Sequence, residues 1–132
     1  MTDDHQFPHE SLEAYRVALR LSAQACELAD TIPRGRRKLA DQLVRAATST
    51  PLLVAEGANR VSRPDKAHKY TEARSEAAEC GAGADVAQTQ KVGHQELAVE
   101  VLSLARRAGS LLTGLIAKNS DEEWARRYRG EL

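Results

Sequence analysis

Apolar residues recur every three or four positions along four stretches of this chain, the spacing of one face of an α-helix. The stretches cover approximately residues 10–31, 36–58, 64–90 and 95–118. No alternation with a period of two, which would indicate a strand, competes with them. The three connections are short and contain proline or glycine, as expected between antiparallel neighbours. The pattern therefore predicts an all-α fold, an antiparallel up-down-up-down four-helix bundle.

The chain length fits one domain with one core. We expect the bundle to span residues 10–118, preceded by an N-terminal extension at 1–9 and followed by a polar C-terminal tail at 119–132. In the tail, Ser120 and Glu123 have the spacing of a capping box, which makes the tail a candidate for a short last helix.

The second predicted helix has a proline deep inside it. Pro51 lies within the run Leu39–Gly57, which ends in Ala55-Glu56-Gly57. Proline in a helix interior removes a hydrogen bond and clashes with the preceding turn, at a cost of roughly 3 kcal/mol. We therefore predict a kink in this helix near Pro51.

The first and last helices carry two apolar seams each. In the first helix one seam comprises Tyr15, Leu19, Cys26 and Ala29, and the other Ala14, Ala18, Leu21, Ala25, Leu28 and Ile32. In the last helix the seams comprise Leu97, Val101, Leu104, Ala108, Leu111 and Leu115, and Ala98, Leu102, Ala105, Leu112 and Ile116. A bundle helix needs one stripe of about 100°. The surplus predicts self-association into a homo-oligomer; the alternative is a wide core stripe with some leucines left at the surface.

The third helix has an inward seam of mostly small residues. The seam comprises Tyr70, Ala73, Ala77, Cys80, Ala84 and Ala87, with Gly81 and Gly83 nearby. Small side chains allow close helix approach, although each glycine costs about 1 kcal/mol of helix propensity. The two interpretations are a closely packed seam and a looser middle that bends when a partner binds.

The charge is balanced overall but not along the chain. The 19 basic and 19 acidic residues give a formal net charge of zero, which argues against strong nonspecific binding to phosphates. The first connection nevertheless contains Arg34, Arg36, Arg37 and Lys38, and the predicted topology places Lys91 at the same end. This end is either a solvated turn that complements a helix dipole or a binding site for nucleic acid or an acidic protein partner.

Three further residues are candidates for structural pairing between helices. Glu56 and Arg74 are expected to meet across the second and third helices, where a charged pair would fix the helix register. Arg45 is expected to pair in the same way, toward either Glu79 or a neighbouring subunit.

Signals for catalysis are weak. Neither a nucleophile elbow nor a phosphate-binding glycine loop appears. A di-iron bundle needs Glu-x-x-His motifs on paired helices, and the nearest sequence is a single Asp65-x-x-His68. We therefore expect no enzymatic activity, no cofactor and no metal.

The sequence also bears on location. Its apolar runs are too short and too charged to cross a membrane, and its first ten residues lack a secretion signal. We expect a cytoplasmic protein without a membrane partner. Cys26 and Cys80 are then expected to be small buried hydrophobic residues in a reducing compartment, with a disulfide or redox pair as the alternative.

Several residues of this chain together resemble the sequence signature of a known family. They comprise Leu39, Gln42-Leu43, Arg45-Ala46-Ala47, Ser49, Pro51 and Ala55-Glu56-Gly57, with Leu12–Tyr15, Ala18, Ile32-Pro33, Ala73-Arg74, Glu79 and Leu112–Ile116 in support. This set resembles the four-helix-bundle proteins encoded in 23S ribosomal RNA intervening sequences. One departure is Thr50-Pro51-Leu52-Leu53-Val54, where that family usually has Ile-Pro-Ser-Asn-Ile.

The resemblance implies a bundle that assembles into a ring, typically a pentamer. It also implies kinship with the accessory proteins of diversity-generating retroelements, which bind nucleic acid and a reverse transcriptase. From the sequence we therefore expect a non-catalytic homo-oligomeric scaffold or interaction protein. The alternative is a nucleic-acid-binding accessory protein that uses the basic first connection.

Overall fold

The computed structural model describes residues 6–121 and is all-α over that range. Its elements are the short 3-10 helices η1 (Pro8–Ser11) and η2 (Arg34–Arg36) and the α-helices α1 (Glu13–Asp30), α2 (Arg37–Ala58), α3 (Arg63–Gln90) and α4 (Gln95–Lys118). The predicted all-α class and the four helices are confirmed over the described residues. Glu123, the second residue of the expected capping box, lies outside the described residues.

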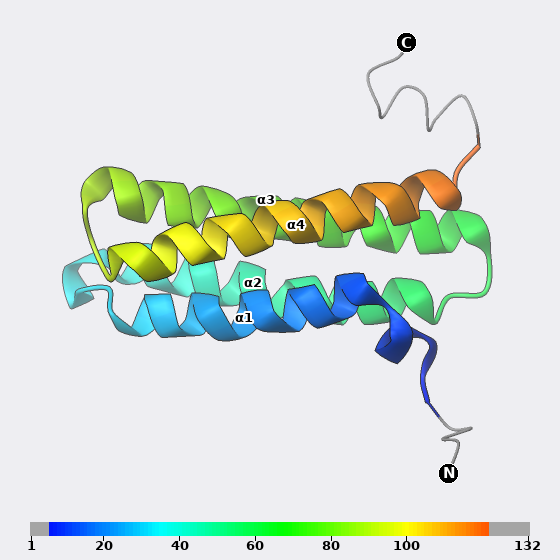
Figure 1. Ribbon diagram of the computed structural model, residues 1–132, viewed down its shortest axis with the longest axis horizontal. Coiled ribbons are helices and arrows are strands. Elements are labelled where there is room, and N and C mark those ends of the chain that lie inside the picture. Colours follow the sequence, from blue (N-terminus) through cyan, green and yellow to red (C-terminus); the bar gives the residue numbers. More distant parts are fainter. Residues whose placement is uncertain (1–5, 122–132) are drawn as a thin grey trace.

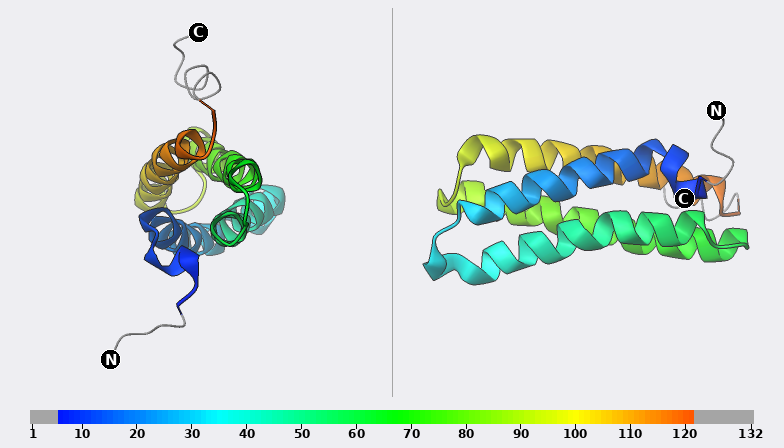
Figure 2. Two further views of the ribbon diagram at one scale, coloured as in Figure 1. Left: turned by 90° about the vertical axis from the view of Figure 1, so that its right-hand side faces the viewer. Right: turned by 90° about the horizontal axis from the view of Figure 1, so that it is seen from below.

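The four long helices pack side by side around a common axis (Figures 1 and 2). Each helix contacts its neighbours in the chain, and α1 closes the bundle against α4. Between these two, Gln24 Nε2 donates to Glu100 Oε1 at 2.9 Å, and the backbone nitrogen of His94 donates to Thr31 Oγ1 at 2.8 Å. Because residue numbers rise along α1 as those of their partners fall along α4, the two helices run in opposite directions.

The starts of α1 and α3 differ from the predicted ones for local reasons, and α2 begins one residue after its predicted start. α1 begins at Glu13 instead of near residue 10, because the chain first forms η1 and then becomes extended at Leu12, whose φ and ψ are −82° and 129°. α3 begins one residue earlier than the pattern predicted. Ser62 precedes it, and its hydroxyl accepts a hydrogen bond from the backbone nitrogen of Asp65 at 3.2 Å, which satisfies one of the free amides of the first turn.

Pro51 lies inside α2 and is buried. The helix is assigned without interruption on both sides of it. The preceding residue, Thr50, is fully buried, and its hydroxyl donates to the carbonyl of Ala46 at 2.8 Å. The buried hydroxyl of Thr50 is therefore satisfied inside the helix, while the kink predicted at Pro51 stays a prediction.

The small-residue seam of α3 forms the centre of the core. Its buried residues are Tyr70, Ala73, Ala77, Cys80, Gly81, Gly83, Ala84 and Ala87. A Cβ atom placed on Gly83 would lie 2.7 Å from Cδ2 of Leu43 on α2, and one placed on Gly81 would lie 3.3 Å from Cβ of Ala105 on α4. The closely packed interpretation is confirmed, since the absence of side chains lets α2 and α4 approach α3.

The two cysteines differ in environment, and both are free thiols. Cys80 is buried as expected, whereas Cys26 is half-buried. None of the helices within residues 6–121 is long and apolar enough to cross a membrane.

Candidate functional site

The basic first connection forms an exposed cluster at one end of the bundle, the left end in Figure 1. Arg34 and Arg36 lie in η2, while Arg37 and Lys38 form the first turn of α2. None of the four side chains makes a hydrogen bond or ion pair with another residue of the described chain. They therefore present four cations to solvent without local neutralisation.

Lys91 lies at the same end, as predicted. It follows α3 in a left-handed conformation, with φ 56° and ψ 43°, and its side chain is exposed. The next helix begins after His94, whose Nδ1 accepts from the backbone nitrogen of Leu97 at 3.2 Å. Because the backbone nitrogen of His94 also donates to Thr31, this connection is held against the end of α1, next to η2.

The start of α2 adds to the positive potential of this end. No side chain caps its free amides, and its first turn contains no acidic residue. The N-terminus of a helix carries a partial positive charge, which acidic residues normally offset. Here Arg37 and Lys38 occupy that turn instead. The free backbone amides and the two basic side chains therefore both favour the binding of an anion.

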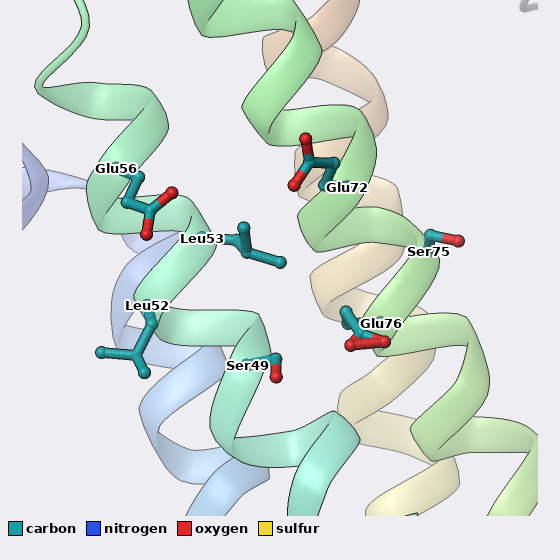
Figure 3. Close-up of a pocket in the computed structure, with 7 residues that line it drawn as sticks. All are labelled: Ser49, Leu52, Leu53, Glu56, Glu72, Ser75 and Glu76. Atoms are coloured by element: carbon teal, nitrogen blue, oxygen red, sulfur yellow. The ribbon is translucent and has the colours of Figure 1, made fainter.

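A second candidate surface is a groove between α2 and α3, which the sequence did not reveal (Figure 3). Its volume is about 440 Å³. It is lined by Ser49, Leu52, Leu53, Glu56, Glu72, Ser75 and Glu76. In Figure 3 the Leu53 side chain points from α2 toward α3, whereas Leu52 lies on the outer side of α2. The groove thus combines an apolar edge with three carboxylates.

The carboxylate of Glu56 pairs with a different residue from the one expected. Its Oε2 lies 3.3 Å from Lys69 Nζ, which also lies 3.6 Å from Glu72 Oε2. Arg74, the expected partner, donates instead from Nε to Thr113 Oγ1 on α4 at 2.8 Å. The expected partner was wrong because Lys69 is level with Glu56 along the two helices, while Arg74 lies more than a turn further along and faces α4.

The expected pairing of Arg45 with Glu79 is confirmed, and a second carboxylate joins it. Arg45 Nη2 lies 3.4 Å from Glu79 Oε1, and its Nη1 lies 3.1 Å from Glu76 Oε2. Gln42 Nε2 also donates to Glu79 at 3.2 Å. Glu76 could have been predicted from the sequence, because it lies three residues before Glu79 and residues three apart share a helix face.

This cluster moves the pKa values of its two carboxyls in opposite directions. Burial raises the pKa of Glu76 above its ordinary value, and hydrogen bonding and repulsion from Glu79 add to the shift. Hydrogen bonding with Glu76 holds the pKa of Glu79 below its ordinary value, with help from Arg45 and Gln42. The cluster therefore joins α2 to α3 at a partly desolvated site.

Comparison with known proteins agrees with this architecture. A family model described as 23S rRNA-intervening sequence protein matches residues 10–114. The chain belongs to this family. The resemblance drawn from its sequence motifs is thereby confirmed.

One solved structure supports the fold of this chain. It is the crystal structure of a protein of unknown function from the S23 ribosomal protein family of Bacteroides thetaiotaomicron. The similarity covers 78% of this chain and 97% of that chain, with a TM-score of 0.69 and 19% identity, and so shows the fold alone. No curated protein matches the chain significantly.

Within the described residues, neither the basic end nor the α2–α3 groove contains a cluster of metal-binding side chains. Over residues 6–121, no three His, Cys, Asp or Glu side chains are grouped so that they could hold a metal ion. The charged side chains at the α2–α3 groove pair with one another instead, as Glu56 does with Lys69 and Glu76 with Arg45.

Proposed function

We propose that this protein is a non-catalytic scaffold whose copies assemble into a homo-oligomeric ring, with five subunits as the expected number, and present a repeated surface to a partner. The observation that supports the proposal is apolar exposure on the helices. Leu52 of α2 is 60% exposed, Val99 of α4 56% and Leu19 of α1 44%. Scattered apolar residues are normal on a monomer, so the position of these side chains matters.

The strongest part of this exposure lies on α2. Val44 and Leu52 are both exposed and are separated by eight residues, which places them on one face of the helix. Leu52 also lines the α2–α3 groove. The small Ala78 and Ala82 of α3 are exposed as well. We therefore assign the contact between copies to this face, where small side chains allow a second helix to approach.

The test is the mass of the protein in solution by light scattering at micromolar concentration. The proposal expects a multiple of 14.4 kDa, five times that value for the ring. Leu52→Glu and Val44→Glu should each lower the mass toward 14.4 kDa, because a carboxylate would be buried without a partner. Val61→Glu is the matched control, since Val61 is 98% exposed in the α2–α3 connection and should leave the mass unchanged. A wild-type mass of 14.4 kDa would overturn the proposal.

A second function is supported by the basic end of the bundle. There we propose binding of nucleic acid through Arg34, Arg36, Arg37, Lys38 and Lys91. The four unpaired cations, the uncapped start of α2 and the neighbouring Lys91 all favour phosphate. A ring would gather several such ends and raise the affinity through multivalency.

This second function is tested by binding of single-stranded RNA and duplex DNA at low and moderate salt. Replacing Arg34, Arg36, Arg37 and Lys38 by Ala should abolish binding and its salt dependence. The control is a variant of equal net charge that replaces four exposed basic residues elsewhere with Ala, namely Arg16, Arg20, Arg60 and Arg106. Equal affinity in the two variants would contradict a site at this end.

A further inference from the structure

The α2–α3 groove carries more negative than positive charge (Figure 3). Four carboxylates lie in it or beside it, those of Glu56, Glu72, Glu76 and Glu79. Lys69 Nζ is shared by the first two, at 3.3 Å and 3.6 Å, and the guanidinium of Arg45 is shared by the last two, at 3.1 Å and 3.4 Å. Since each of these two cations serves two carboxylates, the groove favours an occupant that brings further positive charge.

The groove also presents apolar surface next to these charges. Leu53 points from α2 toward α3 in Figure 3, and Leu52 beside it is largely exposed. The remaining lining residues, Ser49 and Ser75, have short side chains that occupy little of the groove. The occupant that fits best is therefore a surface that presents an apolar side chain between cations.

The outer face of α1 presents such a combination. Arg16, Leu19 and Arg20 are all exposed there, and we call these three residues the α1 stripe. Leu19 is one of the large apolar side chains that the bundle leaves open to solvent. Arg16 donates to the carbonyl of Glu10 at 3.4 Å, and within the described chain neither arginine pairs with a carboxylate. The α1 stripe therefore offers two cations that the bundle itself does not pair.

The spacing of the charges in the α1 stripe matches that of the carboxylates in the groove. Arg16 and Arg20 are four residues apart, which is about 6 Å along a helix, and the leucine of the stripe lies between them. Glu72 and Glu76 are also four residues apart and are therefore separated by the same distance along α3. The basic first connection fits the groove less well, because residues 34–38 include no exposed large apolar side chain.

We propose that the contact between copies joins the α1 stripe of one copy to the α2–α3 groove of the next. The inference rests on the proposed homo-oligomer and identifies the two surfaces that form it. Arg16 then lies beside Glu72, with the leucine of the stripe against Leu53. Arg20 lies one turn further along, beside Glu76. Because the stripe and the groove are different surfaces of one molecule, each copy uses both, and such contacts generate a ring when the rotation between copies closes.

The experiment mixes two full-length variants that each lose one of the two surfaces. Arg16→Glu/Arg20→Glu places carboxylates of the α1 stripe against those of the groove, whereas Ser75→Trp fills the groove and leaves the stripe intact. Circular dichroism establishes that both variants are folded. By light scattering at micromolar concentration, each variant alone should have a mass of 14.4 kDa. Their equimolar mixture should give twice that mass and nothing larger, because one intact groove remains for one intact stripe.

The matched control is Arg60→Glu/Arg106→Glu, which changes the net charge equally at two exposed positions outside both surfaces and should keep the wild-type mass. With an oligomeric wild type, an unchanged mass for Arg16→Glu/Arg20→Glu overturns this inference and leaves the homo-oligomer standing. That is the result expected if the groove pairs with the groove or with the basic end of a second copy. A mixture in which both variants remain at 14.4 kDa overturns the inference as well. A wild-type mass of 14.4 kDa overturns the homo-oligomer together with it.

Discussion

Gly57 of α2 lies directly against the ring of Tyr70 of α3. A Cβ atom on Gly57 would be 2.8 Å from both Cδ1 and Cε1 of that ring and 3.2 Å from Cβ of Lys69. Tyr70 is only 3% exposed, so its ring has little room to move away. This contact explains why the Ala55-Glu56-Gly57 sequence ends in glycine, since any side chain would push α2 and α3 apart.

Gly57→Ala is therefore expected to destabilise the protein by about 1–3 kcal/mol, measured by urea unfolding at fixed protein concentration. The steric cost exceeds the gain of about 1 kcal/mol that alanine normally brings to a helix interior. Gly114→Ala is the control, because a Cβ there meets nothing within 4 Å in α4. That variant should be more stable than the wild type by about 0.5–1 kcal/mol, and a similar gain in Gly57→Ala would contradict the close contact.

The carboxyls of Glu76 and Glu79 should affect stability with opposite dependence on pH. The pKa of Glu79 is lowered in the folded protein, so its contribution is present above its unfolded pKa and is lost as pH falls through the folded value. The pKa of Glu76 is raised, so the folded state is favoured while this carboxyl is protonated, and that contribution is lost as pH rises through the folded pKa.

The measurement is the free energy of unfolding of Glu76→Gln and Glu79→Gln between about pH 3 and pH 7. As pH rises, Glu76→Gln should gain stability relative to the wild type, because it removes a carboxylate that is costly to ionise. Glu79→Gln should lose stability relative to the wild type over the same range. Curves that move in the same direction would show that the two carboxyls are not coupled as described.

The two thiols should differ strongly in reactivity. Burial raises the pKa of Cys80 to about 12, with a smaller contribution from Cys26, so the thiolate that reacts is scarce and also inaccessible at pH 8. The folded protein should therefore take up one equivalent of maleimide quickly, at the half-buried Cys26. In Cys26→Ser the rapid reaction should disappear, and slow labelling of Cys80 should follow the opening of the bundle. Rapid labelling of folded Cys26→Ser would disprove the burial.

Helical periodicity was sufficient to predict which residues of each helix face inward. The α3 seam from Tyr70 to Ala87 is buried as expected because a period of 3.6 residues fixes one face of a helix. Periodicity does not determine how far one helix is shifted along another. That shift depends on contacts such as the one between Gly57 and Tyr70. In the resulting register, Lys69 is level with Glu56 and pairs with it. Arg74, the partner predicted for Glu56, lies on the side of α4 instead.

The candidate surfaces were predictable to different extents. The basic end could be found from sequence because its residues are adjacent in the chain and the order of helices places Lys91 beside them. The α2–α3 groove could not, because its lining comes from two separate helices. The exposed Leu52 was equally hidden, since its apolar character alone does not say on which side of α2 it lies.

Lys91 allows the backbone of the basic end to be tested separately from its charge. It is the one non-glycine residue with positive φ in the described chain, a conformation that costs an L-residue roughly 1–2 kcal/mol. Lys91→Gly and Lys91→Ala remove the same charge, but only glycine relieves the strain. Lys91→Gly should therefore be more stable than Lys91→Ala by about 1 kcal/mol in chemical unfolding, and equal stabilities would contradict the left-handed conformation. If Lys91 serves nucleic-acid binding through its charge, both variants must weaken that binding equally despite their different stabilities.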